Sequence, residues 1–479
     1  MKRGEEVTLL LEDFASEGKS VARLEGLVFF VEGGVPGDRV RAEVRKVKKQ
    51  HAEAELRSVL DPSPLRTEPR CRHFGLCGGC RWQHVAYPHQ LAFKAQQVRD
   101  ALERIGGFRG VEVHPALGSP DSYYYRNKME FSFGERWLTE EEMAAGGADR
   151  FGLGLHRARR FDRVLDIREC HLQRDPASAL LNEVRDFCRE RSLEVFSTRT
   201  QRGYLRHLVI RASRNTPDLM VNLVTSAHDP PVLGALVQRL VGKFPELSTV
   251  VNNVTTRKSQ VALGEEERVY YGSGFITERL GARTYRISAN SFFQTNTLQA
   301  ERLYDRVREM ARPHAGDLLY DLYAGTGTIA LHLAGDVREV VGVESSEAAV
   351  EDARGNARMN GVENCRFAAG DLKEWLSGPG PRTAGPPDVV IVDPPRSGMH
   401  PKAAGMLAAL GARRIVYVSC NPATQARDLK IICGGGEYAV AEVQPVDMFP
   451  HTFHIESVAA LERRTAALTL RPAPDILKQ

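Results

Sequence analysis

The 479-residue sequence lacks a long hydrophobic run, since no window reaches the roughly 18 apolar residues that a membrane-spanning helix needs. Its polar first residues, MKRGEEV, are not those of a secretory signal peptide. We therefore expect a cytoplasmic protein with no membrane partner. In that compartment the eight cysteines are expected to be thiols, metal ligands or packing residues rather than disulfides.

The chain also lacks a strong net charge, because 65 Lys and Arg residues and 61 Asp and Glu residues leave a formal charge of +4. The basic residues are unevenly spread, however, and gather in segments 39–51, 156–174 and 202–214. Any one of these segments is equally well explained as a solvated face. Basic surface on several segments favours an extended polyanion as the partner.

No internal repeat is present, and the chain is too long for one compact core. Residues 1–60 hold short strand-like runs between Gly-, Pro- and Asp-bearing turns, which predict a small OB-like β-barrel. Residues 61–275 contain a linker, a cysteine cluster, an amphipathic helix near 88–106 and then longer strands. This second region is predicted to be a mostly antiparallel α+β domain.

Residues 276–479 alternate strand-like runs with helix-like segments. Such alternation predicts a doubly wound, largely parallel, Rossmann-like sheet, so the fold class is multidomain α/β. The Gly- and Pro-rich stretch 377–388 is expected to be a loop.

The segment DLYAGTGTIAL, residues 321–331, follows a predicted strand and opens a predicted helix, with Gly325 and Gly327 in the turn. The next strand ends at Glu344, whose carboxylate can accept hydrogen bonds from ribose hydroxyls. A nicotinamide cofactor would favour a third glycine where Ala330 stands. S-adenosylmethionine carries no phosphate and needs no third glycine, so we favour the methyl donor.

Two further residues stand at predicted strand ends, Asp393 in VVIVDPPRSG and Cys420 in VYVSCNP, and FPHTFHIESV carries Glu456 as a candidate base. In a doubly wound sheet the tips of neighbouring strands face one crevice. Helix capping by Asp393 and core packing of Cys420 are the ordinary alternatives. We expect His454 and Glu456 to lie on one face of a late strand. The Asp-Pro-Pro motif also occurs in amino-group methyltransferases, but Arg396 replaces their following aromatic residue.

A cluster of three cysteines has the spacing C-x5-C-x2-C, and a fourth cysteine in RECHL is its expected partner (Cys71, Cys77, Cys80 and Cys170). Four thiolates can bind zinc or an iron–sulfur cluster, and this spacing suits a four-iron cube better than the two close pairs typical of zinc. The nearby histidines, His73 and His84, are not expected to be ligands. The remaining thiols are expected to be packing residues (Cys188, Cys365 and Cys433).

Together these motifs resemble the RNA uracil-C5 methyltransferase family, which makes 5-methyluridine, nearly from end to end. Residues 1–60 resemble a TRAM RNA-binding domain, CRHFGLCGGCRWQH resembles the iron–sulfur segment, and YRNKMEFSFG the central domain. Five further motifs resemble those of the family's catalytic class I methyltransferase domain: SANSFFQTN, DLYAGTGT, DPPRSG, SCNP and FHIESV. One departure is Ala324, where relatives often carry cysteine.

The resemblance implies that S-adenosylmethionine is bound by Gln294, Tyr323, Glu344 and Asp393, with Asp371 as a further contact. It implies Cys420 as nucleophile and Glu456 as base, and a 4Fe-4S cluster on Cys71, Cys77, Cys80 and Cys170. Residues 61–275 would form the central domain and 276–479 the methyltransferase domain.

The implied function is methyl transfer from S-adenosylmethionine to C5 of a uridine in RNA. We prefer 23S ribosomal RNA over transfer RNA as substrate, because relatives with both a TRAM barrel and a cluster often act on it, and we take a monomer as the default. A cytosine-C5 RNA methyltransferase would be expected to lack the HIESV base and the cluster. A non-catalytic RNA-binding protein would not need the complete set of site residues.

Overall fold

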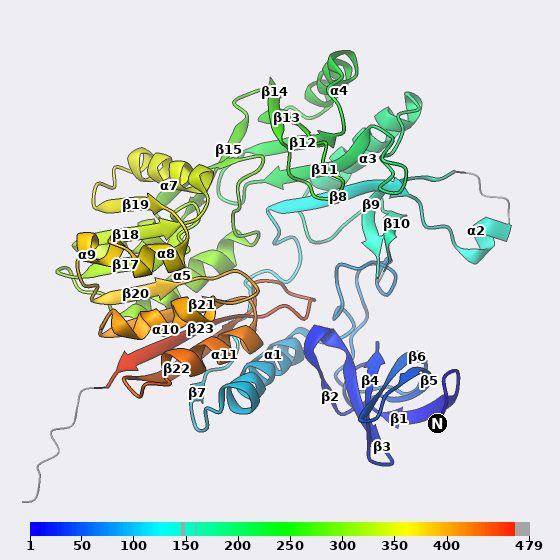
Figure 1. Cartoon of the computed structure of the whole chain (residues 1–479). Helices are drawn as coiled ribbons and strands as arrows, with labels where there is room; N and C mark the ends of the chain where they lie inside the picture. The colour runs from blue at the N-terminus through cyan, green and yellow to red at the C-terminus, as the bar shows by residue number, and fades with distance from the viewer. Residues whose placement is uncertain (145–148, 159, 465–479) are drawn as a thin grey trace, which may run out of the picture.

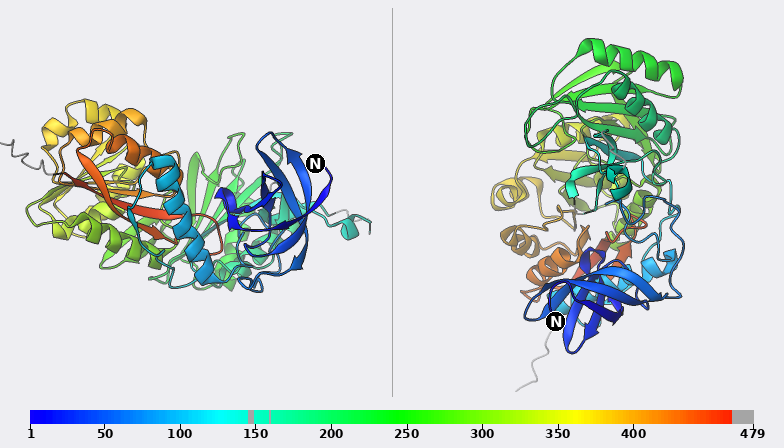
Figure 2. Two further views of the ribbon diagram at one scale, coloured as in Figure 1. Left: turned by 90° about the horizontal axis from the view of Figure 1, so that it is seen from below. Right: turned by 90° about the vertical axis from the view of Figure 1, so that its right-hand side faces the viewer.

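The structure is a computed structural model that describes residues 1–144, 149–158 and 160–464. Its strands form sheets of six, seven, two and eight strands within these ranges. The six-stranded sheet lies beside the long helix α1 (Tyr87–Ala101), at the end of the molecule away from helix α4 (Pro230–Lys243) (Figures 1 and 2). No helix in the described ranges is both long and apolar enough to span a membrane.

The N-terminal sheet has the strand order β1-β5-β6-β4-β3-β2. Alternate residues of β5, such as Val40, Ala42 and Val44, are buried in one core with Phe29 and Val31 of β4, while the charged residues between them lie on the other face. The strands span Glu6–Leu10 (β1), Asp13–Phe14 (β2), Ser20–Leu24 (β3), Leu27–Glu32 (β4), Arg39–Val47 (β5) and His51–Asp61 (β6).

The amphipathic helix predicted near 88–106 is confirmed as α1, which continues as a π-helix over Leu102–Gly106. The short strand β7 (Glu112–Val113) follows and pairs with the C-terminal sheet. Buried Val98 and Ala101 of α1 also belong to the core of that sheet. The helix and strand therefore pack with the C-terminal sheet, although they precede the central sheet in the sequence.

The central seven-stranded sheet has the order β10-β9-β8-β11-β12-β13-β14 and is antiparallel except between β12 and β13. Helices α3 and α4 bury their apolar faces on one side of it. Its elements are β8 (Lys128–Glu135), α2 (Glu140–Ala144), β9 (Phe151–Arg157), β10 (Arg160–Asp166), α3 (Ala177–Glu190), β11 (Leu205–Ala212), β12 (Leu219–Thr225), α4, β13 (Thr249–Val254) and β14 (Glu266–Tyr271). A hairpin of β15 (Phe275–Leu280) and β16 (Arg283–Ser288) leads out of it.

The C-terminal sheet has the order β19-β18-β17-β20-β21-β23-β22-β7, and its first five strands are parallel. This confirms the predicted Rossmann-like sheet. Helices α5, α6 and α7 cover one face, and α1, α8, α10 and α11 cover the other (Figure 1). The stretch 377–388, expected to be a loop, contains the short helix α9.

The strands of this sheet are β17 (Leu318–Leu322), β18 (Glu339–Glu344), β19 (Cys365–Ala369), β20 (Val389–Val392), β21 (Arg414–Ser419), β22 (Tyr438–Val446) and β23 (Glu456–Arg463). Its helices are α5 (Thr297–Ala311), α6 (Thr328–Leu333), α7 (Glu347–Met359), α8 (Leu372–Ser377), α9 (Gly380–Ala384), α10 (Pro401–Ala409) and α11 (Pro422–Ile432).

Candidate active site

The turn between β17 and α6 has a backbone shape that requires glycine. Gly325 and Gly327 have φ angles of 55° and 79°, in the left-handed region. A Cβ on Gly327 would lie 3.0 Å from the ring of Phe367 and 3.1 Å from Ala353. Glycine at position 327 therefore lets the turn pack closely against these side chains, whereas a Cβ on Gly325 would meet open space.

Glu344, at the end of β18, lies directly against this turn. Its Oε2 accepts a hydrogen bond from the Gly325 N–H at 3.1 Å, and its Oε1 accepts one from the Ser346 N–H at 2.8 Å. These bonds orient the carboxylate at the carboxyl edge of the sheet, where its remaining lone pairs can receive ribose hydroxyls.

A cavity lies beside the turn, lined by Tyr323, Val343, Asp371, Leu372 and His400 among others. Its mixture of an aromatic ring, aliphatic side chains and a carboxylate suits an adenosine group. The Asp371 side chain also caps α8 by accepting from the Glu374 N–H at 3.1 Å. The residues present therefore fit S-adenosylmethionine, with Tyr323 and Asp371 at the cavity and Glu344 at the glycine turn.

Gln294 belongs to the segment that connects the β15–β16 hairpin to α5. Its main-chain oxygen accepts from the Asn127 side chain at 2.9 Å, which ties this segment to the region just before β8. Two residues later, Asn296 caps α5 and donates to the Met448 carbonyl at 3.2 Å. Gln294 is thus positioned where the central and C-terminal sheets meet.

Cys420 and Glu456 are brought together by the pairing of β21 with β23. These strands are antiparallel, and Ser419 pairs with Ser457. One further step along this register places Cys420 opposite Glu456. Two residues 36 positions apart in the sequence thus meet at the edge that also carries the glycine turn.

The ionisable groups at this edge have raised pKa values. Burial raises the pKa of the Cys420 thiol to about 11, with contributions from the charges of Glu456 and Asp393 and opposition from Arg396. Burial also raises the pKa of Asp393 to about 6. Glu456 is only 4% exposed, and burial, followed by the charge of Asp393, raises its pKa well above the usual value. Cys420 is therefore a thiol, and not a thiolate, in the free protein at neutral pH.

The expectation that His454 and Glu456 share a strand face is wrong. Strand β23 begins at Glu456, and His454 belongs to the irregular segment before it, where His451 has a φ of 65°. His454 donates its backbone N–H to the Thr452 hydroxyl at 3.2 Å, and its Nδ1 lies 3.4 Å from the Arg396 guanidinium. Local turn bonds therefore replace strand pairing at this point.

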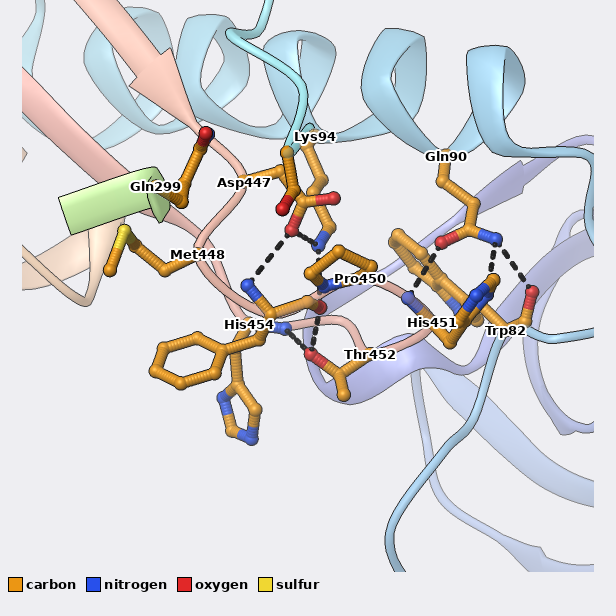
Figure 3. A network of polar contacts seen from close by, with 12 residues as sticks. Trp82, Gln90, Lys94, Gln299, Asp447, Met448, Pro450, His451, Thr452 and His454 are labelled. Atoms are coloured by element: carbon orange, nitrogen blue, oxygen red, sulfur yellow. Dashed lines mark hydrogen bonds and ion pairs between the residues drawn. The ribbon is translucent and has the colours of Figure 1, made fainter. Parts of the chain in front are cut away.

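The segment 447–454 is held by side chains of α1 (Figure 3). Lys94 donates to Asp447 at 2.6 Å, and both side chains are fully buried. Gln90 accepts from the His451 N–H at 2.9 Å and donates to the Val85 carbonyl at 2.8 Å. The sequence contains no signal for the ion pair, because its partners lie 353 residues apart.

Asp321, near the end of β17, lies at the site, although the motifs did not predict it as a site residue. Its side chain is 1% exposed and accepts from the Ala330 N–H at 3.0 Å. Burial, together with the charge of Asp393, raises its pKa to about 7. The sequence does contain a signal for this residue, because an acidic side chain stands inside the apolar run LLYDL.

The four clustered cysteines line one cavity together with apolar side chains such as Phe74, Leu155 and Ile167. Burial raises the pKa of Cys77 to about 11 and that of Cys80 to about 12. Within the described ranges, no three His, Cys, Asp or Glu side chains are grouped closely enough to bind one metal ion. His73 also lines the cavity, whereas Cys188 is buried in the core of the central sheet, as expected for a packing residue.

Comparison with known proteins agrees with this geometry. The family model described as tRNA (Uracil-5-)-methyltransferase matches residues 246–378 and 386–464, and the TRAM domain model matches residues 1–56. An uncharacterized RNA methyltransferase of Chlorobaculum tepidum is 46% identical over 470 residues, which cover 96% of this chain and 97% of the relative. A relative of Porphyromonas gingivalis with the same description is 42% identical and covers 95% and 99%.

Among solved structures, the Pyrococcus abyssi tRNA (uracil-54, C5)-methyltransferase in complex with S-adenosyl-L-homocysteine is 32% identical to this chain. The similarity covers 95% of this chain and 100% of that one, with a TM-score of 0.73. The chain therefore belongs to the RNA uracil-C5 methyltransferase family, as an S-adenosylmethionine-dependent enzyme with an N-terminal TRAM domain.

Proposed function

We propose that the protein methylates C5 of a specific uridine in RNA through a covalent bond between Cys420 and C6 of the uracil. The observation that carries this proposal is the β21–β23 register, which sets Cys420 opposite Glu456 at the edge with the glycine turn. Uracil C5 is a poor nucleophile, and addition of a thiolate at C6 makes it electron-rich.

The proposed reaction uses two residues of the chain in turn. The Cys420 thiol gives its proton to solvent, and the sulfur bonds to C6 while the C5=C6 electron pair shifts toward C4 and O4. When bound, S-adenosylmethionine supplies a methyl group on a positively charged sulfonium, and C5 takes this methyl group. Glu456 then removes the C5 proton, and the C6–S bond breaks to release 5-methyluridine and the Cys420 thiolate.

The environment of Glu456 supports the role of base. An ordinary carboxylate, with a pKa of about 4.3, is a weak proton acceptor. Burial next to Asp393 makes the ionised form of Glu456 a stronger acceptor, because its pKa is raised. Asp393, Gln294, Tyr323 and Glu344 are assigned to the cofactor, with Asp371 as a further contact. The cavity supports this role for Tyr323 and Asp371, and the glycine turn supports it for Glu344.

The test is transfer of a tritiated methyl group to RNA by Cys420→Ala. We expect complete loss of transfer with S-adenosylmethionine affinity preserved in calorimetry, because the thiol is needed for addition and not for cofactor binding. The matched control is Cys433→Ala, which removes a half-buried thiol at the end of α11 and should retain activity. Full turnover by Cys420→Ala would refute the covalent mechanism.

For the substrate we propose a uridine of 23S ribosomal RNA, following the association of the TRAM barrel and cysteine cluster with such enzymes. Transfer RNA is the second candidate, because the similar Pyrococcus abyssi enzyme is named for uridine 54 of transfer RNA. Mapping the 5-methyluridine lost in a deletion strain decides between them. We further propose a cytoplasmic monomer divided along the chain into residues 1–60, 61–275 and 276–479, with α1 and β7 of the second part packed on the third, and light scattering tests the monomer.

We also propose that Cys71, Cys77, Cys80 and Cys170 hold a 4Fe-4S cluster, supported by the single cavity that they line. One zinc ion would hold four sulfurs only about 4 Å apart, because each Zn–S bond is about 2.3 Å. A four-iron cube binds one cysteine at each iron and keeps the four sulfurs further apart than one zinc ion does. Iron and sulfide analysis of anaerobically purified protein tests this; stoichiometric zinc would refute it.

A further inference from the structure

Three strand ends meet around Cys420, and His454 is one of the side chains there. The Arg396 carbonyl, just after β20, accepts from the Asn421 side chain at 3.3 Å, which ties Arg396 to the turn that follows Cys420. The Arg396 guanidinium in turn lies 3.4 Å from Nδ1 of His454. The imidazole is therefore linked to the cysteine turn through one residue.

The contact with Arg396 determines which imidazole nitrogen carries the proton. A guanidinium has only donors, so Nδ1 must accept, and the neutral ring then carries its hydrogen on Nε2. Burial, together with the charges of Arg396, Lys94 and Arg126, lowers the pKa of His454 to about 4, which keeps the ring neutral at physiological pH.

Neighbouring rings hold the imidazole in place. Its ring centroid lies 4.4 Å from that of Phe453 and 6.0 Å from that of Phe449. Within the described part of the chain, Nε2 forms no hydrogen bond. The site thus contains a neutral, oriented N–H donor that the structure itself does not use.

We propose that His454 is a further catalytic residue, whose Nε2–H donates a hydrogen bond to O4 of the target uracil. This proposal deepens the proposed function and rests on it. When the Cys420 sulfur bonds to C6, the C5=C6 electron pair moves and negative charge develops on O4. A donor placed there stabilises the enolate more than the starting base, which is how such donors accelerate reactions.

The same donor would make the site selective for uracil. Uracil presents an acceptor, O4, at C4, whereas cytosine presents an amino group that is itself a donor. The His454 Nε2–H would pair with the first and oppose the second. Because Nδ1 is already engaged by Arg396, the ring cannot exchange its donor and acceptor sides to suit cytosine.

The test measures the rate at which the protein forms a covalent adduct with RNA carrying 5-fluorouridine at the target position, in the presence of S-adenosylmethionine. The fluorine blocks the later proton removal, so the rate does not depend on Glu456. We expect His454→Phe, which keeps an aromatic ring but has no donor, to form the adduct about 100-fold more slowly, as for loss of one oxyanion donor. His454→Gln, which retains an N–H donor, should recover most of the rate.

S-adenosylmethionine affinity should be unchanged in both variants, and the matched control is His314→Phe, at an exposed histidine in the turn before β17. If His454→Phe forms the adduct as fast as the wild-type protein, the inference is overturned. If His454→Phe fails to bind cofactor, a His454→Gln variant slowed about 100-fold would also overturn it. Absence of any adduct with the wild-type protein would instead count against the covalent mechanism itself.

Discussion

The candidate active site contains carboxyl groups that the fold keeps away from water. Glu456 begins β23 with 4% of its surface exposed, and Asp321, next to the last residue of β17, is 1% exposed. Burial disfavours the charged form of each, and Asp393 lies near both and adds to the effect. Such groups are costly for stability, so their presence at one sheet edge indicates a function.

Replacing Glu456 should separate addition from proton removal. Glu456→Gln keeps the size of the side chain but cannot accept a proton, so methyl transfer should proceed and resolution should stop. We expect a protein–RNA adduct on denaturing gels, labelled by a tritiated methyl group. Glu437→Gln, at an exposed residue before β22, is the control and should leave no adduct. Normal turnover without an adduct would exclude Glu456 as the base.

The raised pKa of Asp321 predicts a pH-dependent stability. The folded state holds this proton up to about pH 7, whereas the unfolded chain releases it near pH 3.8, so the folded state binds more protons between these values. Stability from this group is therefore present at low pH and decreases as pH rises through this window. Asp321→Asn should be more stable than wild type at pH 8 by about 1–3 kcal/mol and show a flatter profile in urea unfolding. An unchanged profile would contradict the assignment.

The order of elements in the C-terminal half could be predicted because parallel strands buried on both faces form continuous apolar runs. The start of β23 could not be predicted, because the segment 447–454 contains aromatic and β-branched residues, which are typical of strands. Its bonds run to α1 and to the segment before α5 instead. The opposition of Cys420 and Glu456 likewise depends on a register that only the folded sheet defines.

The ion pair between α1 and the segment 447–454 should be costly to break. Lys94→Met leaves the Asp447 carboxylate buried without its partner, which typically destabilises by about 3–5 kcal/mol. The double variant Lys94→Met/Asp447→Asn should recover part of this loss in urea unfolding. Lys243→Met, which breaks a solvent-exposed pair with Glu183, is the control and should cost less than about 1 kcal/mol. If Lys94→Met and Lys243→Met lower the free energy of unfolding equally, the buried pair stabilises the fold no more than the exposed one.

At the scale of the whole molecule, a small apolar cluster joins the N-terminal sheet and the cysteine segment to the segment that precedes β23. Phe14 and Val35 from the N-terminal region pack with Trp82 and Val85, which follow Cys80. The backbone N–H groups of Arg81 and Trp82 donate to the His451 carbonyl at 2.8 and 2.9 Å. The arrangement of these parts was beyond sequence reasoning, because the cluster unites residues from three separate regions of the chain.

Trp82 is therefore expected to position the RNA-binding sheet relative to the catalytic residues. Trp82 is fully buried and stacks on Phe14 with ring centroids 4.6 Å apart, so Trp82→Ala removes the centre of the contact. The cofactor site is formed by other strands, and its affinity for S-adenosylmethionine should remain. RNA binding should weaken by about tenfold or more, since a loss of only 1.4 kcal/mol of interface energy has that effect.

Fluorescence anisotropy with target RNA measures this loss, and small-angle scattering should show a larger radius of gyration if the N-terminal sheet separates. Trp137→Ala is the matched control, since this half-buried Trp contacts Arg157 of the central sheet and lies outside the cluster. If Trp82→Ala binds RNA as tightly as Trp137→Ala, the N-terminal sheet is held by other contacts. If it loses S-adenosylmethionine as well, the cluster supports the catalytic sheet rather than the position of the RNA-binding one.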